Sequence, residues 1–182
     1  MFSAILKVCY RDEAQLNIGG ESLVNIVRCL KDSEDVVDFL ETLSQIPWES
    51  LRCEIASKQH LNAATRSILA ADQHIAIARA LANNFAAVNE LTQEQIDSLI
   101  DTDDFDVVSS LLQYMDDEHE GFDDMLLGLS SHIDPANRKL VADHRKASWA
   151  TLERLSKDED PGVKQAARAS LLSRANDLAD QD

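Results

Sequence analysis

The chain has 182 residues, of which 45% are hydrophobic and 27% charged, a composition typical of a globular protein with its own core rather than of a disordered chain. It contains 17 Lys and Arg against 33 Asp and Glu, and the formal net charge of −16 argues against general binding to nucleic acid or anionic lipid. Five glycines and three prolines are few, which favours helices joined by short turns over a sheet with many hairpins.

Apolar residues recur at intervals of three and four throughout, which predicts an all-α chain without a β-sheet. Four of them define a helix at the start of the sequence: Phe2, Ile5, Leu6 and Cys9. Gly19 and Gly20 would end this helix, because glycine is common just after a helix C-terminus. A second helix is expected over 21–31, and a third begins at a cap on Ser33.

From residue 47 onward, each apolar stripe is preceded by a residue that commonly starts a helix. These residues are Pro47, Asn62, Asp72, Thr92, Asp103 or Asp104, Asp134 and Asp160. Thr92 and Gln95 form a capping box, and Asp134 is followed by a proline at the first helical position. The helix that starts at Asp134 is predicted to be the longest and to continue to about Lys157.

The stripes belong to a repeated unit, in which a turn is followed by a branched residue and, four positions later, by aliphatic or small residues. Such units start at Leu51, Ile77, Val107 and Val163, which are 26, 30 and 56 residues apart. These spacings are typical of stacked helical pairs that bury a shared core only with their neighbours. Leu81, Leu111 and Leu152 lie on the apolar stripes and are expected to be buried.

Two segments resemble a known family of helical repeats. Residues 155–167, LSKDEDPGVKQAA, resemble the turn and second helix of a HEAT-like repeat. Residues 77–84, IARALANN, resemble the leucine-rich-repeat-variant form of the same armadillo-type fold. The resemblance extends over residues 47–115 and 145–172. It implies a right-handed α-α superhelix of about five short helical-hairpin repeats.

The resemblance and the spacing of the caps predict a single helical-repeat domain over residues 1–176. Residues 1–46 would form atypical cap helices, 47–175 HEAT-like repeats, and 177–182 a frayed acidic tail. The first apolar run is interrupted by Lys7 and has no cleavage signal, and no apolar run is long enough to span a bilayer. We therefore expect a cytoplasmic protein without membrane contact.

The negative charge is concentrated in the middle of the chain. Between Arg79 and Arg138 there is no Lys or Arg, while the same 58 residues contain fourteen carboxylates. Such a field steers cationic partners toward this part of the molecule. We place a partner-binding site on ten of these residues: Asp101, Asp103, Asp104, Asp106, Asp116, Asp117, Glu118, Glu120, Asp123 and Asp124.

The sequence therefore favours a non-catalytic protein interaction or scaffold module whose acidic surface receives a basic protein or peptide segment. It specifies neither the partner nor the oligomeric state. A second interpretation is a nucleic-acid mimic that blocks a DNA- or RNA-binding protein. A third is that the charge only keeps a scaffold soluble. Carboxylates along one ridge would favour mimicry, carboxylates lining a concavity would favour peptide capture, and an even scatter would favour solubility alone.

An enzyme is not expected. Some HEAT-like proteins are DNA glycosylases, but this activity needs a basic face, and only residues 138–174 could supply a modest positive patch. Ser130, Ser131 and His132 adjoin one another without a Gly-x-Ser-x-Gly motif, and the sequence has no Gly-rich phosphate loop. We assign no catalytic residue.

No metal or cofactor site is predicted. The acidic run at 101–106 resembles the start of a calcium-binding loop. However, the sixth position of the loop is Asp106 instead of glycine, and the twelfth is Leu112 instead of glutamate. Capping of the next helix therefore explains the acidic run better. The leucine-rich-repeat-variant family has an iron–sulfur module with clustered cysteines, whereas Cys9, Cys29 and Cys53 form no Cys-x-x-Cys pair. We expect these cysteines to be small buried hydrophobic residues.

Overall fold

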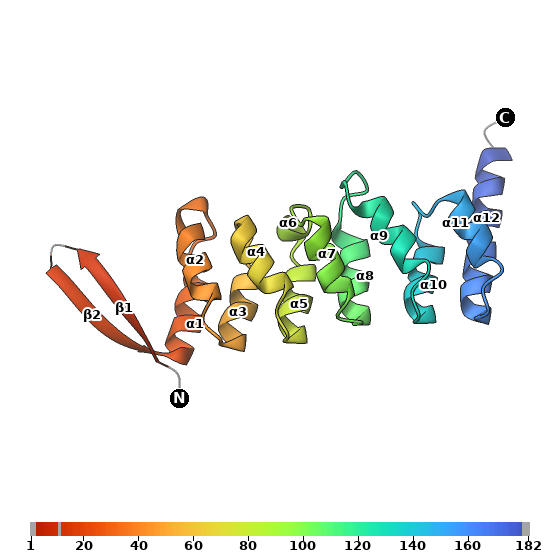
Figure 1. Ribbon diagram of the computed structural model, residues 1–182. Helices are drawn as coiled ribbons and strands as arrows, with labels where there is room; N and C mark the ends of the chain where they lie inside the picture. The colour runs from red at the N-terminus through yellow and green to blue at the C-terminus, as the bar shows by residue number, and fades with distance from the viewer. Residues whose placement is uncertain (1–2, 11, 180–182) are drawn as a thin grey trace. The chain divides into compact units, whose positions relative to one another are not determined.

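Figure 1 shows the computed structural model, which describes residues 3–10 and 12–179. The chain divides into two compact units, Met1–Leu91 and Thr92–Asp182, called unit 1 and unit 2 below. The single domain expected over 1–176 stays a prediction. Along the described part of the chain, no helix combines the length and the apolar character needed to cross a bilayer.

The described residues near the N-terminus form an antiparallel hairpin and not the helix predicted there. Strand β1 (Ser3–Tyr10) pairs with β2 (Asp12–Gly19), and Leu6 lies opposite Leu16. The expectation of no β-sheet is therefore wrong for this segment, and Phe2 of the predicted helix lies outside the described residues. The physical reason is that a short apolar run fits a strand as well as a helix, so its spacing alone does not decide between them.

Beyond the hairpin, the described chain of unit 1 consists of helices and turns. The elements are α1 (Gly20–Cys29), the 3-10 helix η1 (Glu34–Val36), α2 (Val37–Ser44), α3 (Glu49–Ala56), α4 (Ala63–Ala70), α5 (Ile75–Ala82) and α6 (Phe85–Val88). Helix α3 packs against both α1 and α5, so these three form one row. Helix α2 packs against α3 and α4, and α4 packs against α5, so a second row lies beside the first.

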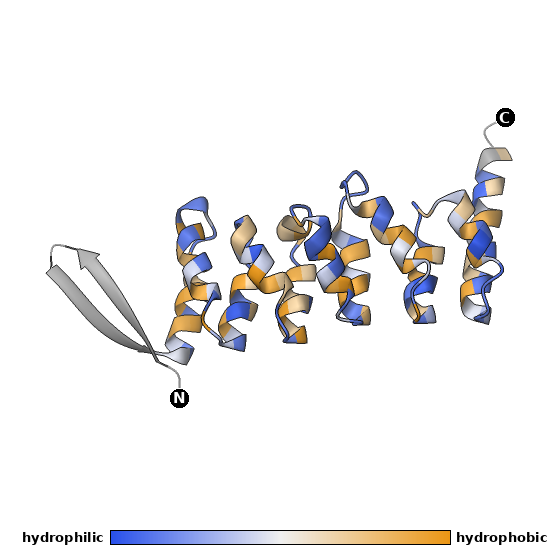
Figure 2. Ribbon diagram, in the orientation of Figure 1, coloured by the Kyte–Doolittle hydropathy of each residue, from blue (hydrophilic) through white to orange (hydrophobic). Residues whose placement is uncertain are grey.

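The described residues of unit 2 form helices connected by turns. Its elements are α7 (Gln93–Ile100), α8 (Phe105–Tyr114), α9 (Phe122–Leu129), α10 (Pro135–Asp143), α11 (Trp149–Leu155) and α12 (Pro161–Ala179). Helix α10 packs against α8 and α12, while α7 lies on α8, α9 on α10, and α11 on both α10 and α12. Figure 2 shows hydrophobic stretches within the helices and hydrophilic turns between them.

The apolar stripes predicted from the sequence form the core. Leu81, Leu111 and Leu152 are fully buried, which confirms their prediction. The helix predicted to run from Asp134 to about Lys157 is instead two helices, because Ser148 caps α11 by accepting a hydrogen bond from the Thr151 backbone N–H at 3.0 Å. A serine competes with the helix backbone for hydrogen bonds and therefore favours a new helix start at this point.

Most of the predicted caps are confirmed. The side chains of Asn62, Thr92, Asp104, Asp134 and Asp160 each accept a backbone N–H from the first turn of the following helix. Thr92 and Gln95 form the expected capping box. Pro47 and Asp72 are not caps, since α3 begins after Trp48 and α5 after His74.

Side chains from one helical pair satisfy the C-terminal carbonyls of the pair before it. In unit 1, Lys58 Nζ donates to Leu30 O at 3.0 Å, and Asn84 Nδ2 donates to Ala56 O at 2.8 Å. In unit 2, Arg174 Nη2 donates to the carbonyl of His144 at 3.0 Å. The last carbonyls of a helix have no partner within the helix, so these bonds couple each pair to its neighbour.

Candidate interaction site

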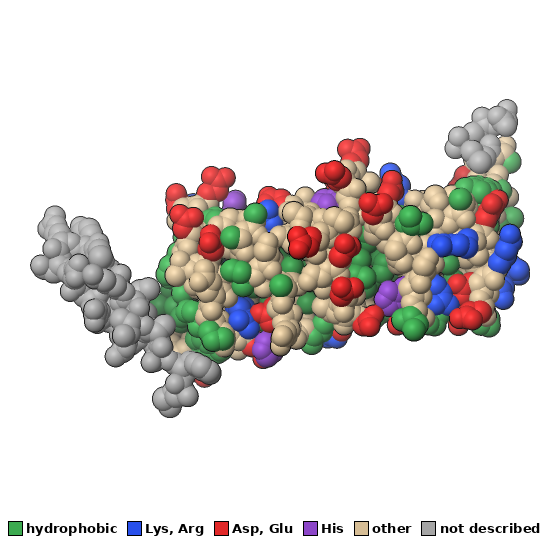
Figure 3. Space-filling model, in the orientation of Figure 1, with side chains coloured by type: hydrophobic (Ala, Val, Ile, Leu, Met, Phe, Trp, Pro, Cys, Tyr) green, Lys and Arg blue, Asp and Glu red, His purple; other side chains and the backbone are tan. Residues whose placement is uncertain are grey.

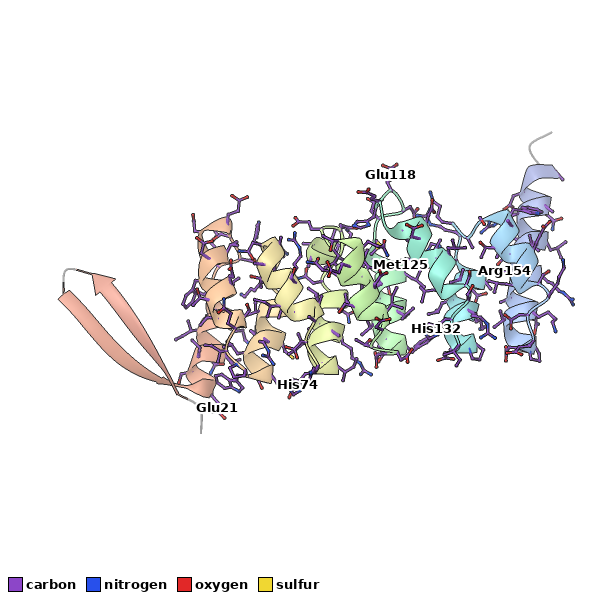
Figure 4. The ribbon with its side chains drawn as sticks, viewed as in Figure 1. Glu21, His74, Glu118, Met125, His132 and Arg154 are labelled. Carbon is purple, nitrogen blue, oxygen red and sulfur yellow. The ribbon has the colours of Figure 1, made fainter. Side chains whose placement is uncertain are left out.

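The ten predicted partner-binding carboxylates all lie in unit 2, but they form two groups and not one patch. Asp101, Asp103, Asp104 and Asp106 lie at the start of α8, while Asp116, Asp117, Glu118, Glu120, Asp123 and Asp124 follow its end. Helix α8 has ten residues and is therefore about 15 Å long. Figure 4 labels Glu118 at the upper edge of this unit and His132, which contacts Asp103, toward its lower edge.

Several of the ten carboxylates, Asp106 included, make contacts within the protein. Asp104 caps α8 through the Val107 N–H, and Asp116 Oδ1 accepts from the Glu118 N–H at 3.0 Å. Asp117 lies against Arg145, and its Oδ2 is 3.3 Å from Lys146 Nζ. Asp103, in the left-handed backbone region at φ 53°, lies 3.1 Å from His132 Nε2. These side chains are less available to a partner because they stabilise turns.

His132 is held in a defined orientation by three neighbours. Its Nδ1 accepts from the Asp134 N–H at 3.1 Å and lies 3.2 Å from Asn137 Nδ2. The hydrogen-bond network therefore assigns the ring proton to Nε2, which donates to Asp103. The two turns that carry Asp103 and His132 are thus fixed to each other.

The serines next to His132 also have structural partners. Ser130 Oγ donates to Leu127 O at 2.6 Å and accepts from Arg154, and Ser131 Oγ accepts from Arg154 Nη1 at 2.9 Å. The guanidinium of α11 thereby holds the turn between α9 and α10. The hydrogen bonds of Ser130, Ser131 and His132 thus have a structural role in this turn.

Two acidic residues of α7 join the exposed members of the predicted site. Glu94, Asp97 and Asp101 are spaced by three and four residues, so they share one side of α7. The loop before α9 lies directly on this helix, because a Cβ at Gly121 would be only 2.4 Å from Gln93 Oε1. The start of α9, which carries Asp123 and Asp124, therefore lies beside the first turns of α7.

We call this surface the acidic face. It consists of Glu94, Asp97, Asp101, Glu120, Asp123 and Asp124, all exposed. Among the described residues none of the six forms an ion pair, and Figure 3 shows Asp and Glu side chains grouped over α7, α8 and α9. Glu94 and Asp97 were missing from the predicted site, although their helical spacing with Asp101 was a signal that could have found them.

A groove of about 820 Å³ lies in unit 2 between the α9–α10 turn and α11. Arg138 at this groove donates to both Asp158 oxygens, at 2.9 and 2.8 Å. The same hydrogen bonds hold the pKa of the Asp158 carboxyl below its usual value. The lining of the groove contains two basic residues, Arg154 and Lys157, and two acidic ones, Glu153 and Glu159. The groove therefore has mixed charge and no clear ligand preference.

The described residues do not gather metal ligands. No group of three or more His, Cys, Asp or Glu side chains converges there. Within the acidic run at 101–106, Asp104 caps α8 and Asp103 contacts His132. Cys29 is exposed, so its expected burial is wrong, while Cys53 is half-buried and its thiol pKa is raised by burial. The side chain of Cys9 lies outside the described residues.

Comparison with known proteins adds no assignment, since no family model, curated protein or solved structure matches the chain.

Proposed function

We propose that the protein is a non-catalytic interaction or scaffold module, built as a right-handed superhelix of helical pairs, whose acidic face receives a basic segment of another protein. The row of α1, α3 and α5 in unit 1 and the row of α8, α10 and α12 in unit 2 support the repeat architecture. Hydrogen bonds from each pair to the carbonyls of the preceding pair support it as well.

The observation that carries the proposal is that some carboxylates of unit 2 have structural roles, whereas those of the acidic face form no ion pair with a described residue. Asp104 caps a helix and Asp117 lies against two cations, whereas no carboxylate of the acidic face forms an ion pair with a residue that the structure describes. Exposed like charges on adjacent helices repel one another, and Lys or Arg from a partner relieves that repulsion. Such a surface raises the association rate of a cationic partner and selects against anionic ones.

Mimicry of nucleic acid is less well supported. A phosphate backbone presents charge at short, regular intervals along one line. The acidic face instead draws its carboxylates from two separate helices, α7 and the start of α9, and not from one continuous element. A DNA glycosylase would need basic side chains that are available to bind phosphates, yet Arg138, Arg145 and Arg174 are engaged within the protein.

The test compares two variants of equal charge. The site variant carries Asp101→Asn, Glu120→Gln, Asp123→Asn and Asp124→Asn, and the control carries Glu21→Gln, Glu34→Gln, Asp35→Asn and Asp38→Asn, exposed residues of unit 1. Each raises the formal net charge from −16 to −12, since four carboxylates are removed. Because only the local field differs, binding of a cationic probe should respond to the site variant alone.

The probe is a dye-labelled peptide of alternating lysine and alanine, titrated at about 0.1 M salt, where the Debye length is about 10 Å. We expect the site variant to lose about tenfold in affinity and the control variant to retain that of the wild type. Equal losses in both variants would mean that only net charge matters, and the acidic face would then be a solubilising surface.

A further inference from the structure

An exposed apolar residue adjoins the acidic face. Leu127 of α9 has 58% of its surface exposed. It follows Asp123 by four residues and Asp124 by three, so all three share one side of the helix. An exposed apolar side chain beside charged residues is an arrangement in which protein interfaces place their anchoring contacts.

The next residue, Gly128, has no role in the packing of the described protein. Its φ is not positive, and a Cβ placed there would meet no atom within 4 Å. Gly121 is different, because a Cβ there would collide with Gln93. Glycine within a helix is less stable than alanine, so the fold alone gives no reason for glycine at position 128.

A glycine beside an exposed leucine leaves the backbone of α9 uncovered. Another chain can therefore approach α9 at Gly128 more closely than at any position with a side chain. The charge on the N-terminal side of this point selects the approaching chain, since Asp123 and Asp124 lie one turn away, whereas Arg154 bonds Ser130 and Ser131 beyond the C-terminal end of α9.

We propose that Leu127 and Gly128 form an apolar docking point for a cationic segment of another protein, one that presents a bulky apolar side chain flanked by Lys or Arg. This inference rests on the proposed function and adds the kind of residue that the partner must supply. A second copy of this chain fits less well, because a symmetric contact would oppose the carboxylates of both copies.

The test uses two dye-labelled peptides of alternating lysine and alanine, one of which has a leucine in place of its central alanine. The proteins are the wild type, Leu127→Ala, Gly128→Gln, Gly128→Ala and the control Leu172→Ala. Leu172 is matched to Leu127 because it is 64% exposed, but it lies on α12. Helix content by circular dichroism checks that each variant is folded.

We expect the wild type and Leu172→Ala to bind the leucine peptide about tenfold more tightly than the alanine peptide. Leu127→Ala and Gly128→Gln should lose this preference and still bind the alanine peptide, since the carboxylates remain. Gly128→Ala, which adds one methyl group, should show an intermediate preference. Because glutamine and alanine favour helix more than glycine does, a loss of preference in these variants does not arise from unfolding.

The outcomes separate the two proposals. If neither peptide binds the wild type, the proposed function fails. If both bind with equal affinity, the acidic face is a cation site but the apolar docking point is wrong. If Gly128→Gln still prefers the leucine peptide to the alanine peptide, Gly128 has no role in docking. Self-association of the wild type in sedimentation, abolished by Leu127→Ala, would identify a second copy as the occupant and overturn the proposal.

Discussion

Arg138 and Asp158 join α10 to the turn before α12, and their contact permits a direct test of the packing of unit 2. Both side chains are only 10% exposed, and the two hydrogen bonds between them are 2.8 and 2.9 Å long. Arg138 Nη1 is already used by the carbonyls of His132 and Ile133, so Asp158 is the counter-charge of a buried guanidinium. The substitution Asp158→Ala removes both hydrogen bonds and leaves the exposed Glu159, 3.9 Å from Arg138 Nη2, as the nearest remaining ion-pair partner.

The expected loss of unfolding free energy is about 3–5 kcal/mol, which is typical when one partner of a buried pair is removed. The two hydrogen bonds between Arg138 and Asp158 give a loss of similar size, because hydrogen bonds to charged groups contribute roughly 1.5–3 kcal/mol each. Asp158 also accepts from the Asp160 N–H at 2.9 Å, which is lost too. The control is Glu159→Ala, whose side chain is 93% exposed and should cost less than about 1 kcal/mol.

The assay is urea unfolding followed by tryptophan fluorescence, since guanidinium salts would screen the pair. The two tryptophans lie in different units, Trp48 in unit 1 and Trp149 in unit 2. A Trp48→Phe background therefore reports the unfolding of unit 2 alone. Equal stabilities of Asp158→Ala and Glu159→Ala would refute the assigned role of the pair.

The same pair predicts a pH dependence. Hydrogen bonds from Arg138 lower the pKa of Asp158 from its ordinary value of 3.8, so folding favours the charged carboxylate. This stabilisation is present above the unfolded pKa and is lost as the pH falls through the lower, folded pKa. The difference in stability between the wild type and Asp158→Ala should therefore shrink below about pH 4. A difference that stays constant into that range would contradict this linkage.

Three further substitutions test single elements of unit 2 by equilibrium unfolding in the same background. Gly128→Ala should stabilise by about 0.5–1 kcal/mol, because the added methyl meets no atom within 4 Å; destabilisation would reveal an unrecognised contact. Asp104→Ala should cost about 1 kcal/mol and Asp104→Asn far less, since both Asp and Asn cap helices; equal costs would argue against the cap. Leu111→Ala should cost about 2–5 kcal/mol through the cavity it leaves, and a loss below about 0.5 kcal/mol would mean that the core can collapse around it.

Sequence reasoning succeeded where structure depends on a few neighbouring residues. The caps at Asn62, Thr92 and Asp104 each involve a backbone N–H three positions away, so the pattern contains both partners. The buried leucines followed from helical spacing in the same way. Ser148 has an equally local signal with Thr151, but the apolar pattern around it predicts one continuous helix.

The composition of the site could be predicted only in part. The contact of Asp117 with Arg145 joins residues 28 apart in the sequence, so its effect on the acidic surface follows from packing and not from local spacing. The nearness of α7 to the start of α9 likewise depends on the fit of Gly121 against Gln93. The sequence located the charge, and the structure distinguished Asp117, which lies against two cations, from the carboxylates of the acidic face, which form no ion pair within the described part of the chain.

The use of the bases within the fold explains why the acidic face remains uncompensated. Lys58 and Arg174 donate to helix carbonyls, Arg138 pairs with a buried carboxylate, and Arg154 bonds the serines after α9, so these cations are engaged within the fold. A charge that served solubility alone could be distributed over the whole surface. In unit 2 the carboxylates of the acidic face, which form no ion pair with a described residue, lie on α7 and at the start of α9, beside an exposed leucine. Location is therefore the property that distinguishes a partner site from a solubilising surface, and the equal-charge variants in the two units measure its effect.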